Sequence, residues 1–163
     1  MYPTESKRIC KVLLAEDNPD DITIVKRVVI KKQDRFQLEA VMDGEDALDF
    51  LKKKWPWHNV WTPDLVVLNI NMPKVDGLGV LKAMKADPAL RLIPVAVWST
   101  SARLEDIREA IEGGCSGMFT KPANRTDAEA QLGAMLEYYW RAWSYPYRDT
   151  KAQAFLKRFE SKG

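Results

Sequence analysis

The sequence predicts an α/β protein in which helices cover both faces of a parallel sheet. The first observation is a set of short, continuously apolar runs at residues 12–15, 65–68 and 95–98. Runs of this kind are typical of strands that are buried on both faces. The second observation is that segments with apolar residues at helical spacing lie between these runs. Strands that alternate with helices indicate a parallel sheet with right-handed crossovers.

Each predicted helix is marked by apolar residues that recur three or four positions apart and therefore share one helical face. The four sets are Ile22, Val25 and Val29; Leu78, Leu81 and Met84; Leu104, Ile107 and Ile111; and Ala128, Leu132, Met135, Tyr139 and Trp143. Glycines and prolines punctuate the joins between strands and helices. An apolar helical face of this kind is typical of a helix that packs against a sheet.

The length and composition suit one globular domain. A chain of 163 residues can bury a sizeable core. Its formal net charge of +2 gives no case for nucleic-acid binding by bulk charge. No segment has the pattern of a secretory signal, and no apolar run is long enough to span a membrane. Cys10 and Cys115 form neither a disulfide framework nor a metal-binding spacing, which indicates reduced thiols in a cytoplasmic protein.

Polar residues follow the predicted strands at the points where these strands end. Glu16 and Asp17 follow the first apolar run, Asn69 follows the second, and Ser99 follows the third. Lys121 ends a further short strand. Because ligands of parallel sheets bind beyond the carboxyl ends of the strands, these residues are predicted to converge on one pocket.

Four separated motifs carry a resemblance to a known family. They lie at residues 11–21, 66–77, 93–101 and 117–122, and each one closes a predicted strand. In these motifs, and in their order, the chain resembles the receiver domain of response regulators. It is most similar to the stand-alone regulators that partner phytochrome-type sensor kinases, which share a Trp- and Tyr-rich last helix and a short extension.

The resemblance implies a flavodoxin-like receiver fold, with a five-stranded parallel sheet in the order 2-1-3-4-5 and helices on both faces. It divides the chain into an N-terminal arm (residues 1–8), a receiver domain (residues 9–143) and a C-terminal extension (residues 144–163). The implied partner is a sensor histidine kinase. The extension is too short for a DNA-binding output domain, so signalling is expected to proceed by protein–protein contact.

The resemblance also implies a role for each residue of the pocket. Asp17 would bind Mg²⁺ directly, and Glu16 would act through a bound water, because Mg²⁺ keeps several waters and takes few protein oxygens. The backbone carbonyl of Asn71 would be a further ligand. Ser99 would hydrogen-bond a phosphoryl oxygen, and Lys121 would neutralise the phosphoryl charge.

Asn69 stands where the family has its phosphoacceptor aspartate. A carboxamide is neutral, is a poor nucleophile, and carries an NH₂ group in place of the second oxygen. The chain as written is therefore predicted to be phosphorylation-deficient. With one carboxylate fewer, Mg²⁺ binding at Glu16, Asp17, Asn69 and Asn71 is expected to be weak, and Lys121 should turn toward Glu16 or Asp17. Asn69 is either native to the protein or an engineered or variant residue in an otherwise working regulator.

Two interpretations of function follow, and an enzyme is disfavoured. The first is a single-domain response regulator of a two-component phosphorelay, and the alternative is a constitutive pseudo-receiver module that never depended on phosphorylation. An aspartyl phosphatase needs two acids where this chain has Asn69 and Asn71. A flavodoxin needs a hydroxyl- and glycine-rich phosphate loop, and residues 16–19 are acidic instead.

The segment at residues 53–63 is long for a connection and contains Trp55, Trp57 and Trp61. Its tryptophans either dock a partner, as exposed aromatic side chains do at interfaces, or cap the edge of the sheet. The second interpretation is favoured here. His58 is the only histidine and is expected to be a solvated loop residue.

Self-association is the expected mode of assembly. Receivers commonly pair through the face formed by the fourth helix, the fifth strand and the fifth helix. That face carries mixed charges at Arg103, Glu105, Asp106, Arg108, Glu109 and Glu112. The last helix carries more aromatic surface than one buried face requires, at Tyr138, Tyr139, Trp140 and Trp143. A homodimer is therefore predicted, and the alternative is a monomer whose tail at residues 145–159 covers these rings.

Overall fold

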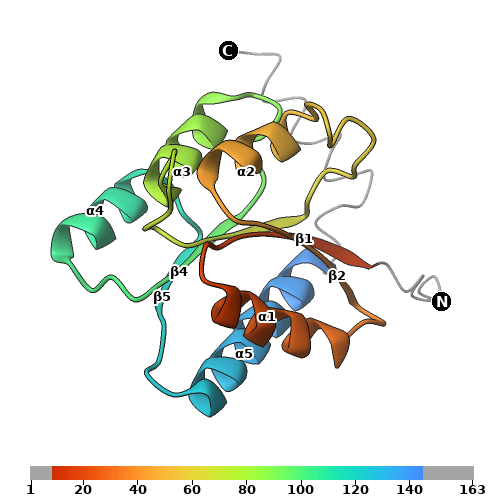
Figure 1. Cartoon of the computed structure of the whole chain (residues 1–163), viewed down its shortest axis with the longest axis vertical. Coiled ribbons are helices and arrows are strands. Elements are labelled where there is room, and N and C mark those ends of the chain that lie inside the picture. The colour runs from red at the N-terminus through yellow and green to blue at the C-terminus, as the bar shows by residue number, and fades with distance from the viewer. Residues whose placement is uncertain (1–8, 145–163) are drawn as a thin grey trace.

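Five parallel strands form the centre of the protein in a computed structural model that describes residues 9–144 (Figure 1). The strands pair in the order β2-β1-β3-β4-β5, and every neighbouring pair is parallel. Within the described residues the elements are β1 (Cys10–Ala15), α1 (Pro19–Ile30), β2 (Phe36–Val41), α2 (Gly44–Leu51), β3 (Leu65–Leu68), α3 (Gly77–Ala86), β4 (Val95–Ser99), α4 (Leu104–Glu112), β5 (Gly117–Thr120) and α5 (Arg125–Ser144). The fold class and strand order are those predicted. The N-terminal arm and residues 145–163 lie outside the described residues.

Helices cover both faces of the sheet, with α1 and α5 on one side and α2, α3 and α4 on the other (Figure 1). The side with α1 and α5 packs residues such as Val25 and Leu132 against the sheet. The opposite side packs Leu13, Phe50 and Leu81. The central strands therefore face apolar side chains in both directions, which is why their sequences are continuously apolar.

Side-chain caps lie at the starts of α1, α2 and α3. Asn18 accepts a hydrogen bond from the backbone N–H of Asp20 at 2.9 Å and starts α1 directly after the acidic end of β1. Asp43 and Asp76 cap α2 and α3 in the same way, each with a distance of 2.7 Å. Such caps satisfy N–H groups that have no partner inside the helix. They hold the first turn of each helix close to the strand ends.

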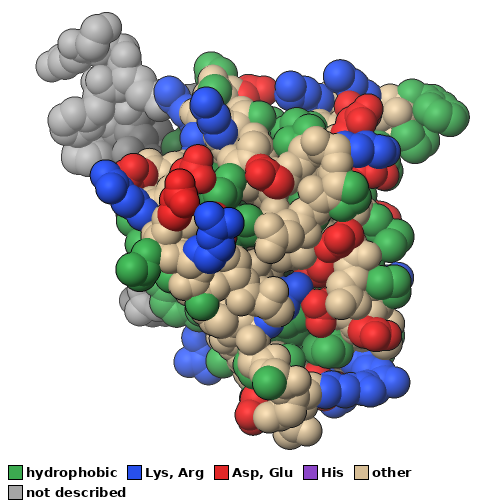
Figure 2. All heavy atoms as spheres, turned by 60° about the vertical axis from the view of Figure 1, so that its left-hand side comes forward, with side chains coloured by type: hydrophobic (Ala, Val, Ile, Leu, Met, Phe, Trp, Pro, Cys, Tyr) green, Lys and Arg blue, Asp and Glu red, His purple; other side chains and the backbone are tan. Residues whose placement is uncertain are grey.

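Helix α4 does not bury the apolar face that its sequence marks. Leu104 is 83% exposed and Ile111 is 62% exposed, whereas Ala110 is fully buried against Ile70 and Val97. Figure 2 shows the side of the molecule that comes forward from the left of Figure 1, where hydrophobic side chains lie among charged ones. The expectation that this helix packs through its large apolar residues is wrong, because the small Ala110 makes the contact.

Two of the three tryptophans in the long connection have a structural role. The rings of Trp57 and Trp61 lie 6.2 Å and 5.3 Å from the ring of Phe50, measured between centroids, and both are partly buried. Trp55 differs, with 81% of its surface exposed, and His58 is exposed as predicted. Among the helices that the structure describes, none has the length and apolar character that a membrane crossing requires.

Candidate functional site

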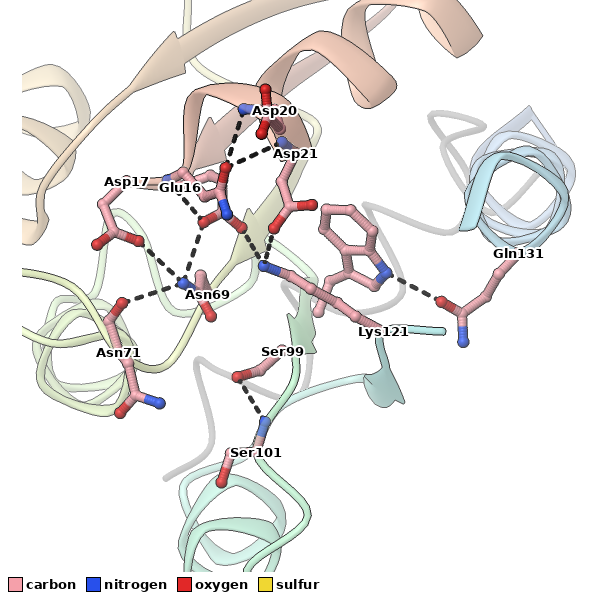
Figure 3. Close-up of polar contacts among 12 residues, drawn as sticks. Glu16, Asp17, Asp20, Asp21, Asn69, Asn71, Ser99, Ser101, Lys121 and Gln131 are labelled. Carbon is pink, nitrogen blue, oxygen red and sulfur yellow. Dashed lines mark hydrogen bonds and ion pairs between the residues drawn. The ribbon is translucent and has the colours of Figure 1, made fainter. Parts of the chain in front are cut away.

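The predicted site residues lie together at the carboxyl edge of the sheet (Figure 3). Glu16 and Asp17 follow β1, Asn69 follows β3, and Lys121 follows β5. Ser99 ends β4 and is fully buried, and its Oγ accepts a hydrogen bond from the Ser101 N–H at 3.2 Å. The convergence expected from strand topology is therefore present.

Asn69 is the centre of these contacts. Its amide nitrogen Nδ2 donates to Glu16 Oε1 at 3.1 Å, to Asp17 Oδ1 at 3.2 Å and to the Asn71 carbonyl at 3.0 Å. Its backbone N–H donates to the Ala15 carbonyl at 3.0 Å, which ties the end of β3 to the end of β1. Asn69 is 7% exposed, so its amide makes these contacts inside the pocket.

The loop after Asn69 is shaped by Gly77 at the start of α3. A Cβ at this glycine would lie 2.0 Å from the Asn69 carbonyl oxygen, which is much closer than real carbon–oxygen contacts. The N–H of Gly77 donates to the Ile70 carbonyl at 2.7 Å. Because no side chain fits here, only glycine allows α3 to begin so close to the pocket.

Glu16 is fully buried and lies between the Asn69 amide and the Lys121 ammonium. Its Oε1 accepts from Asn69 and from the Asn18 N–H, and its Oε2 accepts from Lys121 Nζ at 2.6 Å. Burial raises the pKa of the Glu16 carboxyl above its ordinary value, although the hydrogen bond and the charge of Lys121 oppose this effect. The carboxyl is satisfied by three donors, as a buried polar group requires.

Lys121 contacts Glu16, one of the two acids predicted as alternatives, and its second partner is Asp21. Its Nζ lies 2.8 Å from Asp21 Oδ2 and 4.7 Å from the centroid of the Trp98 ring, and its side chain is only 6% exposed. Asp21 is not among the site residues predicted from the sequence. A signal was present, because an acid in the first turn of a helix that begins beside the strand-end acids faces the same edge of the sheet.

The ring of Trp98 beneath Lys121 is itself held in place. Its Nε1 donates to Gln131 Oε1 at 2.9 Å, and Gln131 Nε2 donates to the Thr120 carbonyl at 2.9 Å. These bonds join β4, α5 and the end of β5 beside the lysine. A cation over an aromatic face is attracted by the ring, so this support favours the observed position of the ammonium.

The pocket in this arrangement does not fit a resident Mg²⁺. Its donors have suitable chemistry, because Glu16, Asp17 and the Asn71 carbonyl offer oxygens. However, these three oxygens surround the Asn69 amide nitrogen at 3.0–3.2 Å, so the point on which they converge is occupied. Within residues 9–144, no three His, Cys, Asp or Glu side chains are arranged to hold a metal ion.

The fold and the strand-end site define a class of protein. The chain belongs to the response regulator receiver domain family, and the match to this family spans residues 12–132. This confirms the family indicated by the four sequence motifs.

Known relatives carry the same architecture. Response regulator Rcp1 of Synechocystis sp. is 32% identical over 129 residues, which cover 79% of this chain and 87% of that protein. The crystal structure of the phosphorylated cyanobacterial phytochrome response regulator RcpA has a TM-score of 0.79 and 32% identity, and covers 81% of this chain and 94% of that chain. A Mn²⁺-bound form of Rcp1 has a TM-score of 0.77 and 30% identity, and covers 80% and 94%.

Proposed function

We propose that this receiver is a cytoplasmic response regulator of a phytochrome-linked two-component phosphorelay, with a sensor histidine kinase as its partner. It signals by protein–protein contact and is not an enzyme. The proposal is supported by its similarity to Rcp1 and RcpA, the second of which is described as a phytochrome response regulator. The pocket supports it too, because Ser99 and Lys121 lie at the strand ends where a phosphoryl group would be bound.

As written, the chain is proposed to be phosphorylation-deficient, and one observation carries this claim. The residue at the phosphoacceptor position is Asn69, whose amide nitrogen faces Glu16, Asp17 and the Asn71 carbonyl. In an aspartate, a carboxylate oxygen can attack phosphorus and form an acyl phosphate as the leaving group departs. A neutral amide lacks that nucleophile.

The test restores the acceptor. Asn69→Asp should become phosphorylated by acetyl phosphate with Mg²⁺, with acetate as the leaving group, whereas the chain as written should not. Intact-mass spectrometry measures the added phosphoryl group. Asn71→Asp is the matched control, because it places a carboxylate two residues away in the same loop and should stay unmodified. Phosphorylation of the unsubstituted chain would refute the proposal.

The second candidate function is a constitutive pseudo-receiver that never depended on phosphorylation. The observation that favours it is the full set of internal partners around Asn69 and Lys121. An Asn69→Asp protein that folds and remains inert toward phosphodonors would favour this module. Incorporation of one phosphoryl group would favour the response regulator.

Binding of Mg²⁺ at Glu16, Asp17, Asn69 and the Asn71 carbonyl is proposed to be weak. The ion would have to compete with the Asn69 amide nitrogen for the same three oxygens. Asn69→Asp removes that competitor and adds a carboxylate, so it should bind Mg²⁺ more tightly. Equal affinities of the two proteins in an NMR titration would contradict this.

The active assembly is proposed to be a homodimer whose state does not respond to phosphodonors. The support is apolar surface, because Leu104, Ile111 and Tyr138 are each more than 60% exposed. The mixed charges of α4 contribute less than expected, since Arg108 pairs with Glu112 within the same helix. Large apolar side chains that are exposed in this way can mark contact sites where they lie together on the surface.

Sedimentation of the full chain and of a version that ends at Ser144 tests this assembly. A dimer that is unchanged by beryllofluoride is expected for the full chain. A monomer that self-associates only after truncation would instead support a tail that covers the aromatic rings. A dimer that dissociates when beryllofluoride is added would contradict the fixed state.

A further inference from the structure

The Asn69 amide nitrogen lies where three oxygens converge from two strand ends. Glu16 Oε1, Asp17 Oδ1 and the Asn71 carbonyl lie 3.0–3.2 Å from it, and all three are hydrogen-bond acceptors (Figure 3). An NH₂ group has two hydrogens, so these acceptors share two donors. The orientation of the amide is set by this environment, because the opposite orientation would place its oxygen against the same acceptors.

This position requires a group with positive charge or positive polarity. A carboxylate at residue 69 would bring an oxygen toward two buried or half-buried carboxylates and a carbonyl, with no donor between them. Like charges at this separation repel strongly where water is excluded. Only a cation or an N–H group can therefore satisfy Glu16 and Asp17 at once.

Lys121 supplies the second positive group on the other side of Glu16. The two carboxylate oxygens of Glu16 are divided, with Oε1 facing Asn69 and Oε2 facing Lys121. The ammonium also bonds to Asp21, which belongs to α1. We call Glu16, Asp17, Asp21, Asn69 and Lys121 the polar cluster. It joins the ends of β1, β3 and β5 to the first turn of α1.

We propose that the Asn69 amide nitrogen is a built-in substitute for a divalent cation, and that Asp21 supplies Lys121 with the anion that a phosphoryl group would otherwise provide. The polar cluster is then structurally complete with neither metal nor phosphate, and the pocket holds one arrangement permanently. The inference rests on the proposed function only in identifying Lys121 as the residue that a phosphoryl group would face. Asp21 acts as a positioning residue for the ammonium.

The first arm of the test uses the full chain without substitution. Its urea-unfolding equilibrium should be the same in EDTA and in millimolar Mg²⁺, with a change in the unfolding equilibrium constant of less than about twofold. A cluster that already contains its positive groups gains nothing from the ion. Strong stabilisation of the unsubstituted chain by Mg²⁺ would overturn the proposal.

The second arm uses a variant, Asn69→Asp, whose stability is expected to depend on Mg²⁺. Asn69→Asp gives the polar cluster four carboxylates and one ammonium, so it should unfold at lower urea than the parent in EDTA. At about ten times its dissociation constant, Mg²⁺ should lower the unfolding equilibrium constant of this variant about tenfold. Asn59→Asp adds the same charge at an exposed position in the connection before β3, outside the polar cluster, and should show no comparable response. If Asn69→Asp is as stable as the parent in EDTA, the proposal that the Asn69 amide takes the place of a cation is contradicted.

The third arm tests Asp21 and does not depend on the folding of Asn69→Asp. Asp21→Asn should raise the unfolding equilibrium constant by about fivefold, because Lys121 loses one of two anionic partners in a partly exposed contact. Asp20→Asn is the matched control, since Asp20 is adjacent and exposed, and its effect should stay below about twofold. Equal effects of Asp21→Asn and Asp20→Asn would show that the contact between Asp21 and Lys121 does not stabilise the fold, which would contradict the role proposed for Asp21.

The outcomes separate this inference from the proposed function. If Asn69→Asp is stabilised by Mg²⁺ but takes no phosphoryl group, the inference stands and the proposed response regulator fails. If Asn69→Asp is phosphorylated while Mg²⁺ stabilises the unsubstituted chain equally well, the proposed function stands and the inference fails.

Discussion

Side chains in the strand-end pocket bond to partners inside the domain, whereas the apolar side chains on the outer face of α4 are exposed to solvent. In the pocket, Lys121 and Glu16 are almost entirely buried and are bonded to each other and to further partners inside the domain. On α4, Leu104 and Ile111 lie in solvent, and the helix contacts the core through Ala110. The pocket is closed by internal contacts, whereas the α4 face retains surface that another protein can cover.

This contrast distinguishes the pocket, where a receiver would take up a phosphoryl group, from the α4 face, where it would contact another protein. A receiver that shifts between two packings needs a ligand that favours one of them. Here the internal nitrogen donors already hold the pocket, so no phosphoryl group is needed to maintain its arrangement. The α4 face keeps the exposed side chains that contact requires. Under the proposal of a permanently held pocket, this contact face would be presented at all times.

The largest effect is expected from breaking the pocket at Lys121. Lys121→Met leaves the buried Glu16 and the nearby Asp21 without their shared cation, and loss of one partner of a buried ion pair costs about 3–5 kcal/mol. Urea unfolding of parent and variant measures the loss. Lys26→Met, at an exposed position of α1, should change the free energy of unfolding by less than about 0.5 kcal/mol. A loss below about 1 kcal/mol for Lys121→Met would show that the pocket is more open than its contacts indicate.

The second prediction compares apolar residues on α5 and α4. Leu132 is 1% exposed, and Leu132→Ala should cost about 2–5 kcal/mol because it removes buried methyl groups and leaves a cavity. Leu104 is 83% exposed, and Leu104→Ala should change the free energy of unfolding of the monomer by less than about 0.5 kcal/mol. Thermal and urea unfolding at low protein concentration provide both values.

The same pair of variants tests the contact face. Leu104→Ala should weaken self-association in sedimentation experiments while leaving the fold intact. If Leu104→Ala destabilises the monomer as strongly as Leu132→Ala, then α4 packs inward in solution and the contrast between the two regions is lost.

The sequence predicted the fold well because the sheet is buried on both faces. Continuous apolar runs predict strands β1, β3 and β4, since both faces of each strand contact a helix layer. Strand β2 was only implied by the family resemblance. It lies at the edge of the sheet and its burial is interrupted, so its sequence lacks a continuous apolar run.

The site was predicted less completely, for a physical reason. Strand order brings Glu16, Asn69 and Lys121 to one edge, so their convergence followed from topology. The partner of Lys121 depended on which acid the first turn of α1 places over the pocket, and this is set by the cap at Asn18. Helical periodicity gave the apolar stripe of α4 but not its direction, because a small residue such as Ala110 can form the packed side instead.

The smallest predicted effect concerns the ion pair of Asp43. This residue is buried like the residues of the strand-end pocket, but its partner is exposed like the outer face of α4. It is 8% exposed, while its partner Lys74 is largely in solvent, and their charged atoms are 2.9 Å apart. Burial acts to raise the pKa of Asp43, but the hydrogen bond from the Asp46 N–H and the contact with Lys74 outweigh it and lower the pKa. A lowered pKa in the folded state means that the ionised form stabilises the fold.

That stabilisation is present above the unfolded-state pKa of about 3.9 and is lost as the pH falls through the lower folded-state value. Asp43→Asn keeps an oxygen that can accept from Asp46 but removes the charge that faces Lys74. It should lower the free energy of unfolding at pH 7 by less than about 1 kcal/mol, and the difference from the parent should shrink as the pH is lowered below about 4. Urea unfolding at both pH values measures this, with the exposed Asp34→Asn as a control that should differ little from the parent at pH 7. A difference that is equally large at both pH values would mean that the amide disturbs the α2 cap itself, and that the charge of Asp43 contributes nothing.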